Sequence, residues 1–274
     1  MGTLYIVGTP IGNLEDISPR ALRILREADC VAAEDTRHTL KLLNYYEIKT
    51  PLASYHEHNK REKGPDLIRQ LQQGRNIALV TDAGMPCISD PGVDLVKLCI
   101  DGHIPVESVP GPSALVTALA VSGMDSRRFV FEGFLPRDRK KRGQILSELR
   151  SEPRCIVLYE APHHLKATLS DLAGALGDRP AALARELTKA HEETIRAGLC
   201  TLAEKYKTEE PLGEYVIIID AKEFDKKDTY DMTVEEHVKS YREDGLSEMD
   251  AMKRVARDRG IGKREVYEIL KNRV

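Results

Sequence analysis

The sequence contains no tryptophan, and its five cysteines are scattered over 274 residues without a C-x-x-C pair. An odd number of isolated cysteines excludes a regular disulfide framework and a zinc site built from cysteine pairs. Such cysteines are typical of small core or loop residues in a reducing cytosol. They are Cys30, Cys87, Cys99, Cys155 and Cys200.

Long apolar runs are missing as well. No stretch approaches the roughly 18 apolar residues that a membrane span requires. Residues 4–7 are too short an apolar run for a signal peptide, and glycine and proline follow them. The net charge of −3 does not indicate nucleic-acid binding, so any such contact must come from local basic patches. We therefore expect a soluble, cytoplasmic protein that does not associate with a membrane.

Strand-like and amphipathic helical segments alternate through residues 1–120 and again from about 129 to 221. This alternation indicates an α/β fold with a mostly parallel sheet in the first half. A chain of this length can remove roughly 75% of its unfolded surface from water, so it needs no disulfide or metal to hold it together. One expected helix begins at Ser18 and Pro19, and others cover residues 65–73, 93–100 and 113–122. Expected strands cover residues 4–7, 31–33, 77–80, 106–109, 129–131, 155–159, 181–184 and 215–220.

Five blocks are rich in glycine, proline and small polar residues, and four of them follow apolar, β-branched segments. Strands of an open α/β sheet bring their loops to one edge, and a small-molecule site forms where the loops converge. Small residues suit such loops because the backbone itself must approach the ligand. The blocks are residues 8–14, 82–86, 110–114, 159–163 and 185–189.

The first block does not fit the better-known phosphate-binding loops. Gly8 and Gly12 are four positions apart and Asn13 follows. In a Walker A loop the second glycine comes five positions after the first, and a lysine follows it. Pro10 occupies the place of the second glycine in a dinucleotide-binding fingerprint, which also disfavours a Rossmann-type methyltransferase. Alone, this block predicts a rigid turn between strand and helix.

In the third block, Ser113 is placed to cap the helix that follows.

Together and in this order, the blocks resemble the tetrapyrrole-methylase superfamily. Residues 34–39, 54–59 and 82–92 narrow the resemblance to its branch of ribosomal RNA methyltransferases, and it extends from Leu4 to about Asp220. The resemblance implies a homodimer that acts on 16S rRNA within the small ribosomal subunit.

The resemblance further implies two α/β domains, residues 1–122 and 123–222, that enclose folded S-adenosylmethionine in the cleft between them. Residues 223–274 would form a helical tail. Glu160 departs from the apolar or small residue common in tetrapyrrole-modifying relatives, which suits the rRNA branch. Carried over by motif, the cofactor-binding residues would be Pro10, Asp82, Ala83, Gly84, Met85, Ile88, Ser113, Ala114, Glu160 and Leu187.

The implied reaction is methylation of a ribose 2′-hydroxyl on a cytidine in the decoding region. A hydroxyl is a poor nucleophile until its proton begins to leave, so a nearby general base should help. The leading candidates are His56, His58 and Glu34, with Lys189 next in line. Other candidates in or near the same motifs are Asp35, His38, Glu57, Glu186 and His191. His56 and His58 would share a face if their segment is extended. The sequence offers no convincing third ligand that would let these two histidines bind a metal ion. For each candidate base, the alternative role is a structural hydrogen bond.

Local clusters of basic residues provide the expected RNA contacts. Residues 137–142 hold five bases and one acid, and the alternative interpretation of this run is a solvated turn. The predicted RNA-binding residues are Arg37, Arg137, Arg139, Lys140, Lys141, Arg142, Lys189, Arg254, Arg257 and Lys263.

The tail has its own helical pattern. Thr233 and Glu236 form a capping-box sequence, Ser247 precedes a second helix that stops near Gly260, and a third helix begins at Lys263. Residues 225–250 hold 9 acids and 4 bases, whereas residues 251–274 hold 8 bases and 3 acids. The pattern predicts a helix-turn-helix-like unit that contacts nucleic acid, or alternatively one that only packs or dimerises.

Two other functions remain open on the sequence alone. The same fold can serve a methyltransferase of a tetrapyrrole or another non-RNA substrate, which the basic run and the polarised tail disfavour. The chain can also be a non-catalytic nucleic-acid-binding protein that depends on its tail. That interpretation leaves the five loop blocks unexplained, and an absence of cofactor binding would support it.

Overall fold

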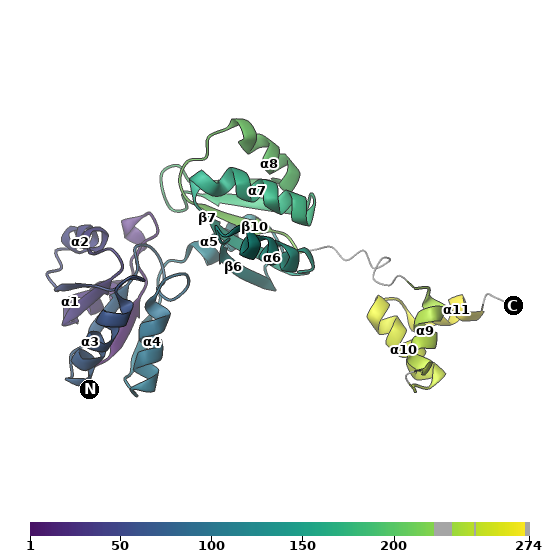
Figure 1. The fold of residues 1–274 in the computed structure, drawn as a ribbon, viewed down its shortest axis with the longest axis horizontal. Coiled ribbons are helices and arrows are strands. Elements are labelled where there is room, and N and C mark those ends of the chain that lie inside the picture. The colour runs from purple at the N-terminus through teal and green to yellow at the C-terminus, as the bar shows by residue number, and fades with distance from the viewer. Residues whose placement is uncertain (222–231, 244, 272–274) are drawn as a thin grey trace. The chain divides into compact units, whose positions relative to one another are not determined.

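The computed structural model describes residues 1–221, 232–243 and 245–271, and the chain forms two compact units, Met1–Ala221 and Lys222–Val274 (Figure 1). The α/β class with a C-terminal helical unit is confirmed. The expected boundary between residues 222 and 223 lies outside the described residues, and the division at residue 122 stays a prediction. In the described part, no helix is long and apolar enough to cross a membrane.

The first sheet is entirely parallel, as the alternating pattern predicts, with strand order β3-β2-β4-β1-β5. Its central strands are buried on both faces because helices cover each face. Ser18 caps α1 as expected, since its side chain accepts the N–H of Ala21 at 3.1 Å. The elements are β1 Leu4–Val7, η1 Leu14–Asp16, α1 Pro19–Glu27, β2 Cys30–Ala33, α2 Thr36–Tyr45, β3 Leu52–Ser54, α3 Lys60–Gln72, β4 Ile77–Val80, α4 Gly92–Asp101 and β5 Val106–Val109.

One expected helix boundary before β4 is wrong, and the form of the segment that carries His56 and His58 is now defined. The helix α3 begins at Lys60 rather than at Pro65, which lies inside it. Pro65 is the sixth residue of α3, where it lacks the N–H for one helical hydrogen bond, yet the helix continues to Gln72. The segment from His56 to Asn59 is a turn rather than an extended strand, because the carbonyl of His56 accepts the N–H groups of Asn59 and Lys60, both at 3.0 Å.

The second sheet is mixed, with strand order β6-β7-β10-β8-β9. The strand β6 is parallel to β7, whereas β10 is antiparallel to β7 and β8, and β9 to β8. The helix α5 packs on one face of this sheet, and α6, α7 and α8 pack on the other. The elements are α5 Ala114–Ser122, β6 Phe129–Phe134, α6 Arg139–Arg150, β7 Cys155–Glu160, α7 Pro162–Leu176, β8 Pro180–Arg185, β9 Glu193–Gly198, α8 Leu199–Thr208 and β10 Tyr215–Ile219.

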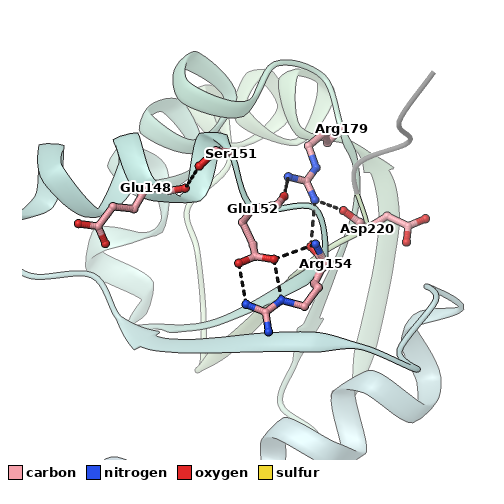
Figure 2. Close-up of polar contacts among 6 residues, drawn as sticks. All are labelled: Glu148, Ser151, Glu152, Arg154, Arg179 and Asp220. Atoms are coloured by element: carbon pink, nitrogen blue, oxygen red, sulfur yellow. Dashed lines mark hydrogen bonds and ion pairs between the residues drawn. The ribbon is translucent and has the colours of Figure 1, made fainter. Parts of the chain in front are cut away.

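A polar cluster closes one end of the second sheet (Figure 2). Arg179 donates to the carbonyl oxygens of Glu152 and Arg154, both at 3.3 Å, and to that of Asp220. The side chain of Glu152 in turn accepts the guanidinium of Arg154 at 2.7 Å. One arginine thus joins the chain before β7, the chain before β8 and the end of β10. The carboxyl ends of β7 and β8 and the amino end of β10 lie at the opposite end of the sheet.

The tail contains the three expected helices, α9 Val234–Glu243, α10 Glu248–Arg259 and α11 Lys263–Lys271. The capping box forms, with Thr233 and Glu236 each accepting the backbone N–H of the other at 3.2 and 2.6 Å. Val238, Val255 and Val266 belong to a separate small core of this unit.

Candidate active site

A cavity of about 390 Å³ lies where loops of the two sheets meet. Small-molecule sites typically enclose about 300–1,000 Å³, so the size suits a cofactor. The first wall, on the side of the first sheet, consists of Ile11, Glu34, residues 81–85 and 88–90, Ser113 and Ala114. The second wall consists of Phe134, residues 159–161, Ala184, Glu186, Leu187, Lys189 and residues 214–216.

Strand direction explains why residues distant in sequence meet here. In the parallel first sheet, the carboxyl ends of β2 and β4 lie at one edge and deliver their loops to it. In the second sheet β10 runs antiparallel, so Tyr215 at its amino end pairs with Glu160 and Arg185 at the carboxyl ends of β7 and β8. Both walls therefore consist largely of strand ends.

Backbone contacts shape the first wall. Thr9 and Gly84 form an isolated antiparallel bridge with N···O distances of 3.0 and 3.1 Å. Gly84 has a φ of +85°, a conformation that residues with a side chain rarely adopt, and a Cβ there would lie 3.3 Å from Ile11 Cγ2. A Cβ on Gly8 would lie 2.7 Å from the Cα of Gly111. The glycines of these loops therefore permit approaches that no other residue allows.

Two carboxyl groups of the first wall are held by bonds between neighbouring strand ends. Thr81 Oγ1 donates to Glu34 Oε2 at 2.7 Å, and the backbone N–H of Asp35 donates to Asp82 Oδ1 at 3.1 Å. Because β2 and β4 are adjacent in the sheet, these bonds join the loop after one strand to the loop after the other. Glu34 and Asp82 are thereby oriented at the cavity.

The second wall relies on side chains. The hydroxyl of Tyr159 accepts the N–H of Leu115 at 3.1 Å in the first turn of α5, and burial raises the pKa of this tyrosine. Ser113 occupies the N-cap position, but the expectation that its side chain caps α5 is wrong. The Tyr159 hydroxyl instead takes the N–H of the second helical residue, which a capping serine could otherwise accept. Ser113 lines the cavity.

The loop after β8 carries unusual backbone conformations. Glu186 and Thr188 have φ values of +49° and +65°, although neither is glycine. Residues held in this way cost of order 1–3 kcal/mol each and occur often at functional sites. Lys189 Nζ donates to Glu186 Oε1 at 2.9 Å, which holds the pKa of Glu186 below its usual range. The backbone N–H of Asn13 donates to Thr188 Oγ1 at 3.0 Å and so joins the two sides of the cavity.

The cavity is rich in acidic groups. Among the described residues that line it, one amine, that of Lys189, accompanies six carboxyl groups. Such a lining favours a ligand that carries positive charge. The carboxyl groups belong to Glu34, Asp82, Asp90, Glu160, Glu186 and Glu214.

Most of the predicted cofactor-binding residues line this cavity. Pro10 does not line it, and its neighbour Ile11 does. Their assignment to a cofactor stays a prediction, but the structure brings together residues as far apart in the sequence as Asp82 and Leu187. The predicted residues in the lining are Asp82, Ala83, Gly84, Met85, Ile88, Ser113, Ala114, Glu160 and Leu187.

The three leading candidate bases separate in the structure. Glu34 lines the cavity, whereas His56 and His58 lie in the turn after β3 and are not among the lining residues. The centroids of their rings are 6.0 Å apart. The Nδ1 atom of His56 is buried without a hydrogen-bond partner. Among the described residues, no group of three or more potential ligands suits a metal ion.

The predicted RNA-binding residues lie in several places. Arg37 is highly exposed and pairs with Asp35 at 2.7 Å, and Lys189 lines the cavity. The run 137–142 is a turn only at its start. Arg137 lies in a bend before the helix, Asp138 caps α6, and the other four basic residues form the first turn of α6. Exposed members of the predicted set are Arg37, Arg137, Arg139, Lys140, Lys141, Arg254, Arg257 and Lys263, whereas Arg142 turns inward.

Several lining residues were not predicted. Tyr159, Ser89 and Asp90 fall inside motifs that the sequence singles out, so they could have been found there. Residues 214–216 gave no signal, because only the antiparallel direction of β10 brings its amino end to this edge. The unpredicted lining residues are Ile11, Thr81, Ser89, Asp90, Phe134, Tyr159, Ala161, Ala184, Glu214, Tyr215 and Val216.

Solved structures share this fold at low sequence identity. The native form of uroporphyrin III C-methyl transferase from Thermus thermophilus superimposes with a TM-score of 0.58 at 20% identity, over 79% of this chain and 97% of that one. A diphthine synthase gives a TM-score of 0.62 at 17% identity, over 81% and 90%. These likenesses show the fold alone.

Sequence relatives are much closer. A protein of Halalkalibacterium halodurans is 46% identical over 98% of this chain and 94% of its own length, and one of Bacillus subtilis is 45% identical with the same coverage. A protein of Thermotoga maritima is 48% identical over 81% of this chain and 100% of its own length. All three are named ribosomal RNA small subunit methyltransferase I. The family described as tetrapyrrole (corrin/porphyrin) methylases matches residues 3–203, and the chain belongs to this family.

Proposed function

We propose that this chain transfers a methyl group from S-adenosylmethionine to the ribose 2′-hydroxyl of a cytidine in the decoding region of 16S rRNA. The observation that carries the proposal is the identity of 45–46%, over 98% of the chain, with relatives named as small-subunit rRNA methyltransferases. The cytidine, its 2′-oxygen and the decoding region rest on the resemblance of the sequence motifs to that branch.

The cavity fits this cofactor in shape and charge. A Cβ at Gly84 would lie 3.3 Å from Ile11 Cγ2 and from the carbonyl oxygen of Pro112, so only glycine fits this part of the cavity wall without strain, and the acidic lining complements a cationic ligand. When bound, the cofactor supplies a methyl group on a positively charged sulfur. The apolar side chains of Met85, Ile88 and Leu187 would cover the ligand and exclude water. Alignment of the two reactants in such a site supplies much of the acceleration.

Glu34 is the general base that we propose for this reaction. Of the three leading candidates it is the one in the cavity wall, and its Oε2 is already oriented by Thr81. Oε1 would accept the proton of the ribose hydroxyl as the oxygen attacks. His56 and His58 would then not take part in the proton transfer.

RNA would pair with exposed cations of the α/β unit and with those of the tail. Arg37, Arg139 and Lys141 are exposed, so they can pair with phosphates. We further propose that the substrate is rRNA within the small ribosomal subunit, and that the enzyme is a cytoplasmic homodimer.

A tetrapyrrole substrate has weaker support. The C-methyl transferases with this fold share 20–21% identity with the chain, less than half the identity of the rRNA relatives. A purely nucleic-acid-binding role would leave the cavity and its strained loop without a purpose.

The test is methyl transfer from labelled cofactor to small ribosomal subunits and to free 16S rRNA. We expect label in the RNA at one cytidine, whose 3′ phosphodiester bond becomes resistant to alkali because its 2′-oxygen is blocked. Label on a base, or none in either RNA despite cofactor binding, would overturn the proposal. Light scattering of the purified enzyme tests the dimer.

A further inference from the structure

One base of the run 137–142 does not face solvent. The side chain of Arg142 is 17% exposed, and its Nε pairs with Asp171 of α7 at 2.6 Å. Its Nη2 donates to Thr168 Oγ1 at 2.9 Å. Arg142 therefore extends from α6 into the packing between α6 and α7, while Arg139 and Lys141 remain exposed.

Thr168 transmits this contact to the cavity. It is fully buried, and its hydroxyl donates to Glu160 Oε2. A hydroxyl has a single proton, and the guanidinium of Arg142 can only donate. The bond from Arg142 therefore leaves the Thr168 proton directed at Glu160.

Glu160 is the end of this chain of bonds and a residue of the second wall. It is 4% exposed, and its Oε1 accepts the N–H of Ala161 at 2.9 Å. Both oxygens are thus fixed, yet a carboxylate can accept about four hydrogen bonds. The remaining acceptor positions require a donor, and the cavity is where a ligand can provide one.

We infer that Arg142 and Thr168 are positioning residues that hold Glu160 to accept a hydrogen bond from a donor group of the bound cofactor. The identity of that ligand rests on the proposed function. Arg142 would then serve cofactor affinity rather than RNA phosphates, unlike its exposed neighbours on α6.

The test compares Thr168→Val, Thr168→Ser and Arg142→Gln with wild type by calorimetric titration of S-adenosylmethionine. Valine keeps the shape of threonine and removes the hydroxyl, so we expect about tenfold weaker cofactor binding, the usual effect of losing a hydrogen bond to a charged group. Serine should restore most of the affinity, and Arg142→Gln should show a smaller loss. Arg150→Gln, the same change at an exposed position of α6, should leave cofactor affinity unchanged.

Steady-state kinetics separate positioning from general damage. The KM for cofactor should rise in Thr168→Val and Arg142→Gln, while kcat and the KM for RNA change little. Titrating 5′-methylthioadenosine, which lacks the amino-acid part, identifies the donor. A persisting loss points to the ribose hydroxyls or the adenine amino group, and a loss seen only with the full cofactor points to its ammonium group.

Folded Thr168→Val and Arg142→Gln variants that bind cofactor as wild type does would overturn the inference. Equal losses in Arg150→Gln would do the same. A wild-type chain that binds no cofactor would contradict the proposed function instead. Thermal unfolding of each variant verifies folding, and Thr168→Ser keeps the inference testable if Thr168→Val does not fold.

Discussion

The two walls of the cavity are built by different means. The first wall takes its shape from the backbone, through the bridge between Thr9 and Gly84 and the positive φ of that glycine. The second wall takes its shape from side chains, with Glu160 held by Thr168. An added carbon atom should therefore disrupt the first wall, whereas the loss of a single hydroxyl or charge should disrupt the second.

Gly84→Val should have the largest effect, a complete loss of detectable cofactor binding. Valine carries a branched Cβ to a position 3.3 Å from Ile11 Cγ2 and has to adopt a φ of +85°. The strain costs about 1–2 kcal/mol, which is less than the 5–15 kcal/mol that a typical fold has in reserve. Calorimetric titration measures the affinity, and circular dichroism verifies the fold.

The matched control is Gly174→Val, because that glycine is exposed on α7 and an added Cβ meets no atom within 4 Å. It should bind cofactor as wild type does. Unchanged affinity in folded Gly84→Val would show that the backbone does not shape the ligand site.

Glu34→Ala should lower the rate of methyl transfer by roughly 100- to 10,000-fold, because it removes the proposed base, while both substrates still bind. Single-turnover assays with saturating cofactor and RNA measure this rate. His56→Ala and His58→Ala should retain near wild-type rates, since neither lines the cavity. A rate defect seen in a histidine variant and absent from Glu34→Ala would show that the histidine, rather than Glu34, is the general base.

Reversing Arg254, Arg257 and Lys263 to glutamate should weaken RNA binding and leave cofactor affinity unchanged, since these exposed residues belong to neither wall. Each lost phosphate contact should reduce the slope of log affinity against log salt by about 0.7 to 0.9. Filter binding across salt concentrations measures both quantities. An unchanged slope would identify the tail as a packing or dimerisation element.

Glu186→Gln should have the smallest effect. Lys189 lowers the pKa of Glu186 from its ordinary value of 4.5, so this pair stabilises the fold fully above that pH, and the stabilisation is lost as pH falls through the folded pKa. The variant should be about 0.2–1 kcal/mol less stable than wild type near pH 7, with the difference vanishing in acid. Urea unfolding at several pH values measures it. A difference independent of pH would rule out the ion pair as its cause.

Prediction from sequence succeeds where a local pattern has a local cause. The parallel first sheet and the tail helices follow from periodicity and capping residues such as Ser18 and Thr233. The expectation about Pro65 fails because proline is favoured at the first helical position, whereas here the helix begins at Lys60 and continues through Pro65. The Ser113 expectation fails because Tyr159, from a distant strand, supplies the capping hydroxyl.

The sequence by itself determined the α/β class, the small residues of the first wall and the acidic and basic residues available for chemistry. It did so because glycine, proline and apolar periodicity restrict the backbone wherever they occur. Only the tertiary structure decided which charges meet. The reversed direction of β10 brings residues 214–216 to the cavity, and the packing of α6 on α7 turns Arg142 from solvent toward Glu160. Such contacts join residues far apart in the chain, and no local propensity of either partner encodes them.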